Sequence, residues 1–205
     1  MHKEILSENQ VELLALVQKF KREFYLVGGT AIALHIGHRR SIDFDLFKFG
    51  ALKHKNIVSK IEAFNYSYQV TRRVNEQINL NIRDVKFTFF EYPFPIDAKY
   101  KFENYLRLPE IIDLAAMKAY ALGRRSKWKD YIDLYFILKE DYSIEQISEK
   151  AKKIYGQLFS EKLFRAQLIY FEDIDYSESI EYLVPPIPED EIRNFLIEKA
   201  TDIGI

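Results

Sequence analysis

The alternation of apolar and polar positions divides the chain into a part that contains β-strands and a part that is largely helical. Before about residue 108, short apolar or alternating stretches typical of strands lie between amphipathic stretches. From residue 109 onward the spacing of apolar residues predicts helices almost throughout. We therefore expect an α+β fold: a mixed β-sheet flanked by helices over 1–108, followed by a helical region over 109–205 that packs on this core.

The first part begins with a helix and a short strand. One helix face is indicated by the i, i+3, i+4, i+7 spacing of Leu13, Leu16, Val17 and Phe20. The stretch "FYLVGG" is then typical of a short buried strand that ends in two glycines. The following "TAIALHI" predicts a helix with Thr30 near its start.

More strands complete the first part. The stretch "SIDFDLF" alternates through its first six residues, as a half-buried strand does, and "HKNIVSKIEAFN" predicts the next helix. Two further strands are expected over 78–82 and 85–92, with Arg83-Asp84 as a tight connection between them.

The second part is expected to be helical with one irregular segment. Pro109 suits the first turn of a helix, and Gly123 marks a break in the helical pattern. The irregular segment covers 171–192 and holds eight Asp or Glu residues without any Lys or Arg. We call 171–192 the acidic segment. Its charge is opposite to that of the basic stretch over 118–129 that precedes it.

Composition and net charge exclude several classes of protein and of site. A hydrophobic content of 48% over 205 residues allows a substantial core, and a net charge of -1 argues against a protein that coats nucleic acid indiscriminately. There is no cysteine, which excludes disulfides and thiolate metal sites. No apolar signal core or membrane span is visible, so we expect a cytoplasmic protein that does not associate with membranes.

Two aspartates in the alternating stretch are the first candidate for chemistry. In a strand, Asp43 and Asp45 would lie about 7 Å apart on one face, where two carboxylates resist joint ionisation. A divalent cation removes this repulsion, and Mg²⁺ commonly joins one or two carboxylates to substrate phosphates. The alternative is that both aspartates pair with Arg39, Arg40 or the basic stretch at a sheet edge.

The glycines ahead of the aspartates add to the case for a phosphate site. Gly28-Gly29-Thr30 ends a strand and opens a helix, where backbone N–H groups and a hydroxyl can receive a phosphate. The alternative is an ordinary turn that needs small residues. The stretch matches neither the dinucleotide-binding fingerprint nor the P-loop.

Taken together, "LVGGTAIALHIGHRRSIDFDLF" resembles the nucleotidyltransferase-like toxins of the AbiEii/AbiGii family, which belong to abortive-infection and toxin–antitoxin systems. In that family, as in the wider polymerase-β-like superfamily, a small-residue turn is followed at a distance by Asp-x-Asp. The similarity extends over roughly residues 24 to 140. It implies that Asp43 and Asp45 are catalytic and hold the metal.

The resemblance continues in "KAYALGRR" and "KDYIDLYFIL". It implies that Lys118 and Asp130 are a functional pair, with Lys118 on the nucleotide triphosphate, and that Arg125 and Asp133 are weaker candidates. Asp133 would equally orient a neighbouring side chain. The residues themselves show a basic stretch without acids, which suits phosphate but is equally typical of a solvated helix face; it comprises Lys118, Arg124, Arg125, Lys127 and Lys129.

One departure from the family pattern affects the expected metal site. The superfamily usually supplies a third carboxylate from a strand next to the Asp-x-Asp strand, and "VKFTFFEYPF" is the natural candidate. Thr88 occupies the expected position, and Glu91 has the parity of the core face. A second metal ion would then be weakly held, so that catalysis is slow, uses one metal or is lost.

The resemblance implies a nucleotidyltransferase that moves an NMP from an NTP to an acceptor hydroxyl, either an RNA or tRNA end or a protein. Mg²⁺ or Mn²⁺ would be the cofactor, and a cognate antitoxin is the expected partner. The expected nucleotide contacts are Gly28, Gly29, Thr30, Arg39, Arg40, Lys118 and Arg125. The alternatives are a non-catalytic nucleotide- or RNA-binding domain of the same fold and a transferase that acts on small molecules.

Overall fold

The structure is a computed structural model that describes residues 1–122, 124–140 and 142–202. It divides into two compact units, Met1–Glu110 and Ile111–Ile205. This division lies two residues beyond the one expected from the pattern. Packing of the helical part on the sheet stays a prediction.

The first unit contains a seven-stranded sheet with the order β3-β4-β5-β2-β1-β7-β6. The strands are β1 (Tyr25–Val27), β2 (Phe44–Lys48), β3 (Gln69–Val74), β4 (Gln77–Ile82), β5 (Val85–Glu91), β6 (Tyr100–Phe102) and β7 (Leu106–Leu108). Because β2 runs parallel to β5 but antiparallel to β1, the sheet is mixed, which confirms the expected fold class.

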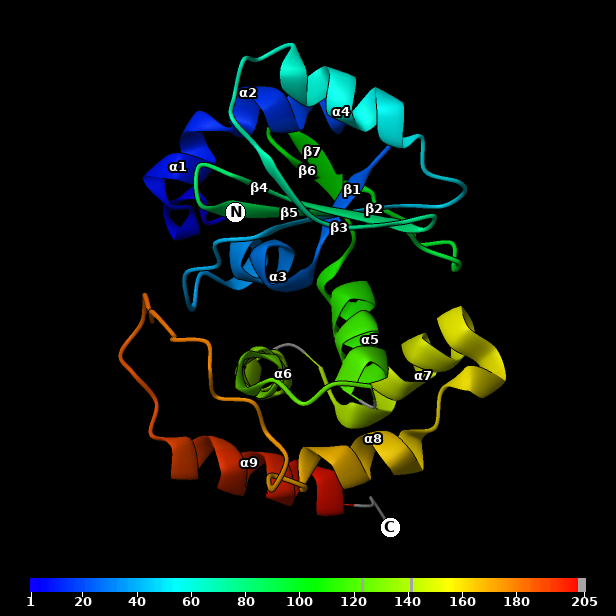
Figure 1. Cartoon of the computed structure of the whole chain (residues 1–205). Helices are drawn as coiled ribbons and strands as arrows, with labels where there is room; N and C mark the ends of the chain where they lie inside the picture. The colour runs from blue at the N-terminus through cyan, green and yellow to red at the C-terminus, as the bar shows by residue number, and fades with distance from the viewer. Residues whose placement is uncertain (123, 141, 203–205) are drawn as a thin grey trace. The chain divides into compact units, whose positions relative to one another are not determined.

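The helices of the first unit cover both faces of this sheet. They are α1 (Glu8–Glu12), α2 (Leu14–Val17), α3 (Gly28–Ile36) and α4 (His54–Glu62). The helix expected near the N-terminus is present, but Leu13, whose ψ is near zero, interrupts it between α1 and α2. Figure 1 shows α2 and α4 on one face of the sheet and α3 on the other.

Aromatic side chains fill the core between the sheet and the face that carries α2 and α4. The ring of Phe89 on β5 lies 4.7 Å from that of Phe20 and 5.2 Å from that of Phe24, between ring centres. Ile57 and Ile61 of α4 are buried as well. Since side chains alternate along a strand, Thr88 and its neighbours of the same parity point to the opposite face, as expected.

The connection between β4 and β5 is the tight turn predicted at Arg83-Asp84. Both residues have positive φ, at 52° and 63°, while Ile82 pairs with Val85. Two positive φ values are the hallmark of the type I′ turn, whose twist matches that of the strands it joins. The turn therefore sets the register in which β4 lies against β5.

The strand β3 forms one edge of the sheet and was not predicted. Its residues are exposed apart from Val74, so it lacks the apolar alternation that reveals a half-buried strand. A bulge between Val70 and Arg72 shifts its register against β4.

The second unit is helical, as expected. Its helices are α5 (Ile111–Leu122), α6 (Trp128–Glu140), α7 (Ile144–Tyr155), α8 (Glu161–Leu168) and α9 (Glu189–Thr201). Pro109 precedes α5 instead of lying in its first turn, and Gly123 lies outside the described residues. The acidic segment is irregular only up to Pro188, because α9 takes up its last four residues.

None of the described helices has both the length and the apolar character that crossing a bilayer requires.

Candidate active site

The turn between β1 and α3 is built around two glycines that other chain segments approach closely. Gly28 has a φ of +73°, and a Cβ at this position would overlap Oδ2 of Asp45. A Cβ on Gly29 would lie 2.6 Å from Nη2 of Arg39 and 3.1 Å from Oγ of Ser41. The absence of side chains here therefore lets a carboxylate and a guanidinium pack directly on the turn.

The two aspartates lie beside this turn. Asp45 is in β2, where it pairs with Val27 of β1 on one side and with Thr88 of β5 on the other. Asp43 directly precedes β2 instead of lying within the strand, and both side chains are half-buried. The structure thus brings Gly28 and Asp45 together, with Asp43 two residues away along the chain.

Thr30 ties the start of α3 to the segment that leads into β2. Its buried hydroxyl lies 2.9 Å from Oγ of Ser41 and donates to the carbonyl oxygen of Asp43 at 2.5 Å. A role for Thr30 as a phosphate ligand stays a prediction. Ser41 was missed from the sequence, although it precedes Asp43 by two residues and shares the parity of the aspartates.

Arg39 and Arg40 have different surroundings. Arg39 is only 2% exposed, and its guanidinium lies against Gly29 and donates to the carbonyl of Arg40 at 2.9 Å. Arg40 donates to the carbonyls of Glu4 and Leu6, at 3.2 and 3.0 Å, and so holds the N-terminal segment. Arg39 thus places positive charge beneath the glycine turn, whereas contact of either residue with nucleotide stays a prediction.

Asp43 and Asp45 are the two carboxylates at this turn that were predicted to hold a divalent ion. As expected, β5 is the neighbour of β2, and the residue opposite Asp45 is Thr88. No group of three His, Cys, Asp or Glu side chains suited to a metal occurs within the described residues. Mg²⁺ is commonly held by one or two carboxylates together with phosphates and water, so a metal site formed by Asp43 and Asp45 stays a prediction.

In the second unit, Lys118 belongs to a buried ionic cluster with two aspartates of α6. Its Nζ lies 2.7 Å from Oδ1 of Asp130 and 2.8 Å from Oδ2 of Asp133. The exposed fractions of the three side chains are 5%, 4% and 0%. Nε of Arg125 reaches the other oxygen of Asp130 at 3.2 Å. The structure therefore joins Lys118 and Asp130, the pair that the resemblance implied.

The other members of the basic stretch also have partners within the second unit. Lys127 and Lys129 both pair with Glu178 of the acidic segment. That pairing matches the opposite charges of the two segments and favours the structural interpretation of the basic stretch.

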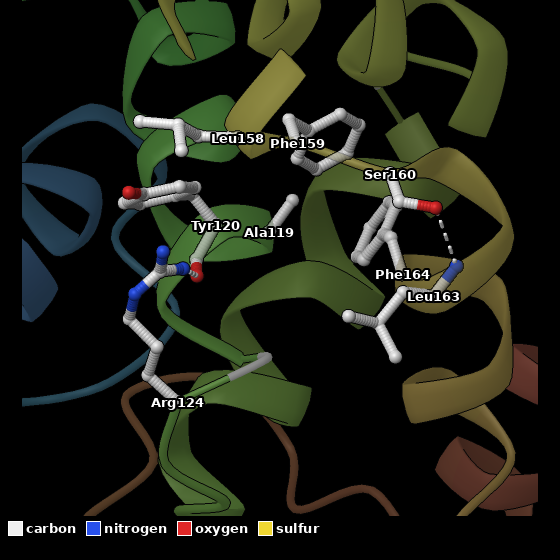
Figure 2. Close-up of a pocket in the computed structure, with 8 residues that line it drawn as sticks. All are labelled: Ala119, Tyr120, Arg124, Leu158, Phe159, Ser160, Leu163 and Phe164. Atoms are coloured by element: carbon white, nitrogen blue, oxygen red, sulfur yellow. Dashed lines mark hydrogen bonds between the residues drawn. The ribbon is translucent and has the colours of Figure 1, made fainter. Parts of the chain in front are cut away.

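A separate pocket of about 260 Å³ lies on another face of α5. Figure 2 shows its lining, which consists of Ala119, Tyr120, Arg124, Leu158, Phe159, Ser160, Leu163 and Phe164. The guanidinium of Arg124 lies over the ring of Tyr120 at 3.6 Å, and this ring stacks on Tyr155 at 3.8 Å. Lys118, although next in sequence to Ala119, is not among the lining residues.

Comparison with protein families gives a match over almost the whole chain. Residues 13–202 match the family described as nucleotidyl transferase AbiEii toxin, type IV toxin–antitoxin system. The chain belongs to the AbiEii nucleotidyltransferase toxin family. Membership confirms the resemblance seen in the glycine turn and the Asp-x-Asp stretch, and it implies a nucleotide substrate and a cognate antitoxin.

Relatives of this AbiEii family chain are found at both the sequence and the fold level. The protein aq_aa25 of Aquifex aeolicus (strain VF5) is 31% identical over 159 residues, which are 74% of this chain and 75% of that protein. The nucleotidyltransferase toxin MenT4 of Mycobacterium tuberculosis H37Rv shares the fold, with a TM-score of 0.64, 13% identity and coverage of 93% and 81%. JHP933 of Helicobacter pylori gives a TM-score of 0.58, 16% identity and coverage of 95% and 91%.

Proposed function

We propose that this protein is a metal-dependent nucleotidyltransferase that moves an NMP from an NTP to an acceptor hydroxyl and acts as the toxin of a toxin–antitoxin pair in the cytoplasm. The observation that carries the proposal is the packing of Asp45 against Gly28 at the head of α3. This packing holds a carboxylate beside backbone N–H groups at a helix start, where a phosphate chain and its cation are both stabilised.

Each residue of the glycine turn has a role in this proposal. The N–H groups that follow Gly28 and Gly29 bind the β- and γ-phosphates, and the buried guanidinium of Arg39 adds positive charge behind them. Asp43 and Asp45 would hold Mg²⁺ or Mn²⁺, which supplies charge neutralisation on the phosphates when bound. The acceptor oxygen forms a bond to the α-phosphorus, the bond to pyrophosphate breaks, and the acceptor proton is lost to solvent.

Lys118 of the second unit also has a role in this proposal. Lys118 would neutralise the triphosphate, with Asp130 fixing its position through the 2.7 Å ion pair and Arg125 supporting Asp130. Such positioning of a cation by a buried carboxylate lowers the freedom that must be lost on binding.

The test uses the purified chain with each of four α-³²P-labelled NTPs, Mg²⁺ or Mn²⁺, and bacterial RNA and protein. We expect label transfer by the wild type and at least about a hundredfold loss in Asp45→Asn, because the metal loses a charged ligand. Asp97→Asn is the control, since Asp97 is an exposed aspartate that pairs with Lys99. Equal transfer by the wild type and Asp45→Asn contradicts the assignment of this site.

A second candidate function is a non-catalytic domain that binds nucleotide or RNA. It is favoured by Thr88, which stands opposite Asp45 where the superfamily usually has a third carboxylate. The variant Thr88→Asp separates the two candidates in the same assay. If the wild type binds NTP without releasing pyrophosphate and Thr88→Asp gains the reaction, the native chain is the non-catalytic domain.

A further inference from the structure

The face of β3, β4 and β5 that is opposite the aromatic core carries a polar surface. The pairing register places Asp45, Thr88, Asn79 and Arg72 in one row across β2, β5, β4 and β3. Paired residues on adjacent strands point to the same face, so this row starts at the proposed metal site and ends at the sheet edge. The carboxamide face, as we call it, consists of Gln69, Arg72, Gln77, Asn79, Asn81, Lys86, Thr88 and Phe90.

Hydrogen-bonding groups dominate the carboxamide face. Gln77, Asn79 and Asn81 occupy alternate positions of β4, and Nε2 of Gln77 donates to Oδ1 of Asn79 at 2.9 Å. Oδ1 of Asn81 is buried and has no hydrogen-bond partner in the part of the chain that is described. Side-chain amides offer a donor and an acceptor side by side, the pattern that matches the edge of a nucleobase.

The charge of the carboxamide face is positive. Arg72 and Lys86 are exposed, and neither has an ion pair with any described residue. The described residues of the three strands contain one carboxylate, Glu91, and its parity places it on the opposite face. Lys118, Arg125, Lys127 and Lys129 of the basic stretch are instead paired with carboxylates. Arg72 and Lys86 are therefore the better candidates for contacts with the phosphates of a polynucleotide.

An aromatic surface adjoins the carboxamide face next to the aspartates. Phe47 of β2 and Phe90 of β5 are paired in register, and their ring centres lie 5.1 Å apart. Both are half-buried, and their parity is that of Asp45 and Thr88. Aromatic rings at such a position can stack on bases of any sequence.

We propose that the carboxamide face binds the single-stranded end of a polynucleotide and presents its terminal hydroxyl at Asp45 as the acceptor. The inference rests on the proposed function and names its acceptor. Three strand spacings of about 4.8 Å separate Asp45 from Arg72, so the row is about 14 Å long and accommodates a few nucleotides. Unpaired cations, base-edge amides and stacking rings together match this ligand better than a protein hydroxyl.

The experiment compares two adjacent arginines that point to opposite faces of β3. Arg72 pairs with Asn79 on the carboxamide face, whereas Nε of Arg73 donates to Nδ1 of His54 on the other face. Binding of fluorescein-labelled RNA and DNA oligonucleotides of about eight nucleotides is measured by anisotropy at several salt concentrations. We expect Arg72→Ala to weaken binding about five- to tenfold and to lower the salt slope by about one, while Arg73→Ala changes affinity less than twofold.

Lys86→Ala provides a second variant on the same face and should weaken binding in the same way. Equal effects of Arg72→Ala and Arg73→Ala, or none, overturn the proposal and leave the transferase assignment standing. Weaker binding by Arg72→Ala in a protein that transfers no nucleotide supports the surface while the proposed function fails. The proposal is also overturned if the wild type transfers label to a protein acceptor and binds neither oligonucleotide. Tighter binding of RNA than of DNA identifies the natural polymer.

Discussion

At the residue scale, Gly28 is the position where the site tolerates least change. Its positive φ strains any side chain, and a Cβ there would displace the carboxylate of Asp45. We expect Gly28→Ala to lower the free energy of unfolding by about 1–3 kcal/mol and to weaken NTP binding, because Asp45 must move. Thermal unfolding and nucleotide titration measure the two effects.

Gly50 provides the control for this prediction. It has a φ of +88°, but nothing lies within 4 Å of the position that a Cβ would take. Gly50→Ala should therefore show the backbone strain without the loss of nucleotide binding. If both variants bind NTP as the wild type does, the contact between Gly28 and Asp45 does not serve the site.

The cluster around Lys118 makes a second prediction at this scale. Lys118→Met leaves Asp133 fully buried without its cation and should cost about 3–5 kcal/mol of unfolding free energy, as buried carboxylates do when a partner is removed. Denaturant unfolding measures this loss. Lys139→Met is the matched control in the same unit, since Lys139 is exposed and its Nζ lies 2.8 Å from the hydroxyl of Tyr135 and 3.8 Å from the carboxylate of Glu191. Equal stability of the two variants contradicts a structural role for the ion pairs of Lys118.

At the element scale, the acidic segment is held against the start of α6 by charges that titrate. The pKa of Glu178 is lowered: burial raises it, but the hydrogen bond from Lys127 and the charges of Lys127 and Lys129 outweigh burial. Because the folded-state pKa lies below the usual value, the pairing stabilises fully above about pH 4.5 and is lost as the pH falls through the lowered pKa.

Trp128 reports on this segment, because it is the only tryptophan and its ring centre lies 5.5 Å from that of Tyr176. We expect its emission to shift to the red as the pH falls from about 6 to about 3.5. Glu178→Gln should show part of the shift at neutral pH already and a smaller change on acidification. An identical titration of wild type and Glu178→Gln contradicts the role of Glu178. Asp175 has a pKa lowered by hydrogen bonds from Ser177, so it titrates in the same direction as Glu178.

Elements with a distinctive local pattern were predictable from the sequence, and elements defined by their neighbours were not. The strands β4 and β5 and the turn at Arg83-Asp84 follow from alternation and turn length. The edge strand β3 is almost wholly exposed, and β6 and β7 have three residues each, so none of them produces a periodic signal. Their existence depends on pairing with strands distant in sequence.

The same distinction applies to the candidate site. Asp43 and Asp45 stand out because two carboxylates interrupt an apolar alternation, and the glycines stand out because they end a strand. The burial of Arg39 against Gly29 and the contact of Thr30 with Ser41 depend on tertiary packing. These contacts join residues that are separated in the sequence, so the burial of Arg39 against Gly29 could not be predicted from local sequence.

At the scale of the whole molecule the net charge is -1, but paired and unpaired charges are distributed unevenly along the chain. Several cations of the second unit are matched by nearby acids, as Glu178 matches Lys127 and Lys129. Cations on the carboxamide face of the first unit, Arg72 and Lys86, are not matched. A composition near neutrality therefore coexists with a local surface that attracts anions.

The edge strand β3 has a consequence for behaviour at high concentration. An exposed edge offers unpaired backbone groups to any second chain, and sheets that join in this way grow into fibrils. In β3 the adjacent arginines Arg72 and Arg73 repel an identical strand. The bulge after Val70 also interrupts the regular backbone edge with which such a strand would pair. Arg72, which is proposed to bind a polynucleotide, would therefore also help to keep the chain from aggregating when it is produced in quantity.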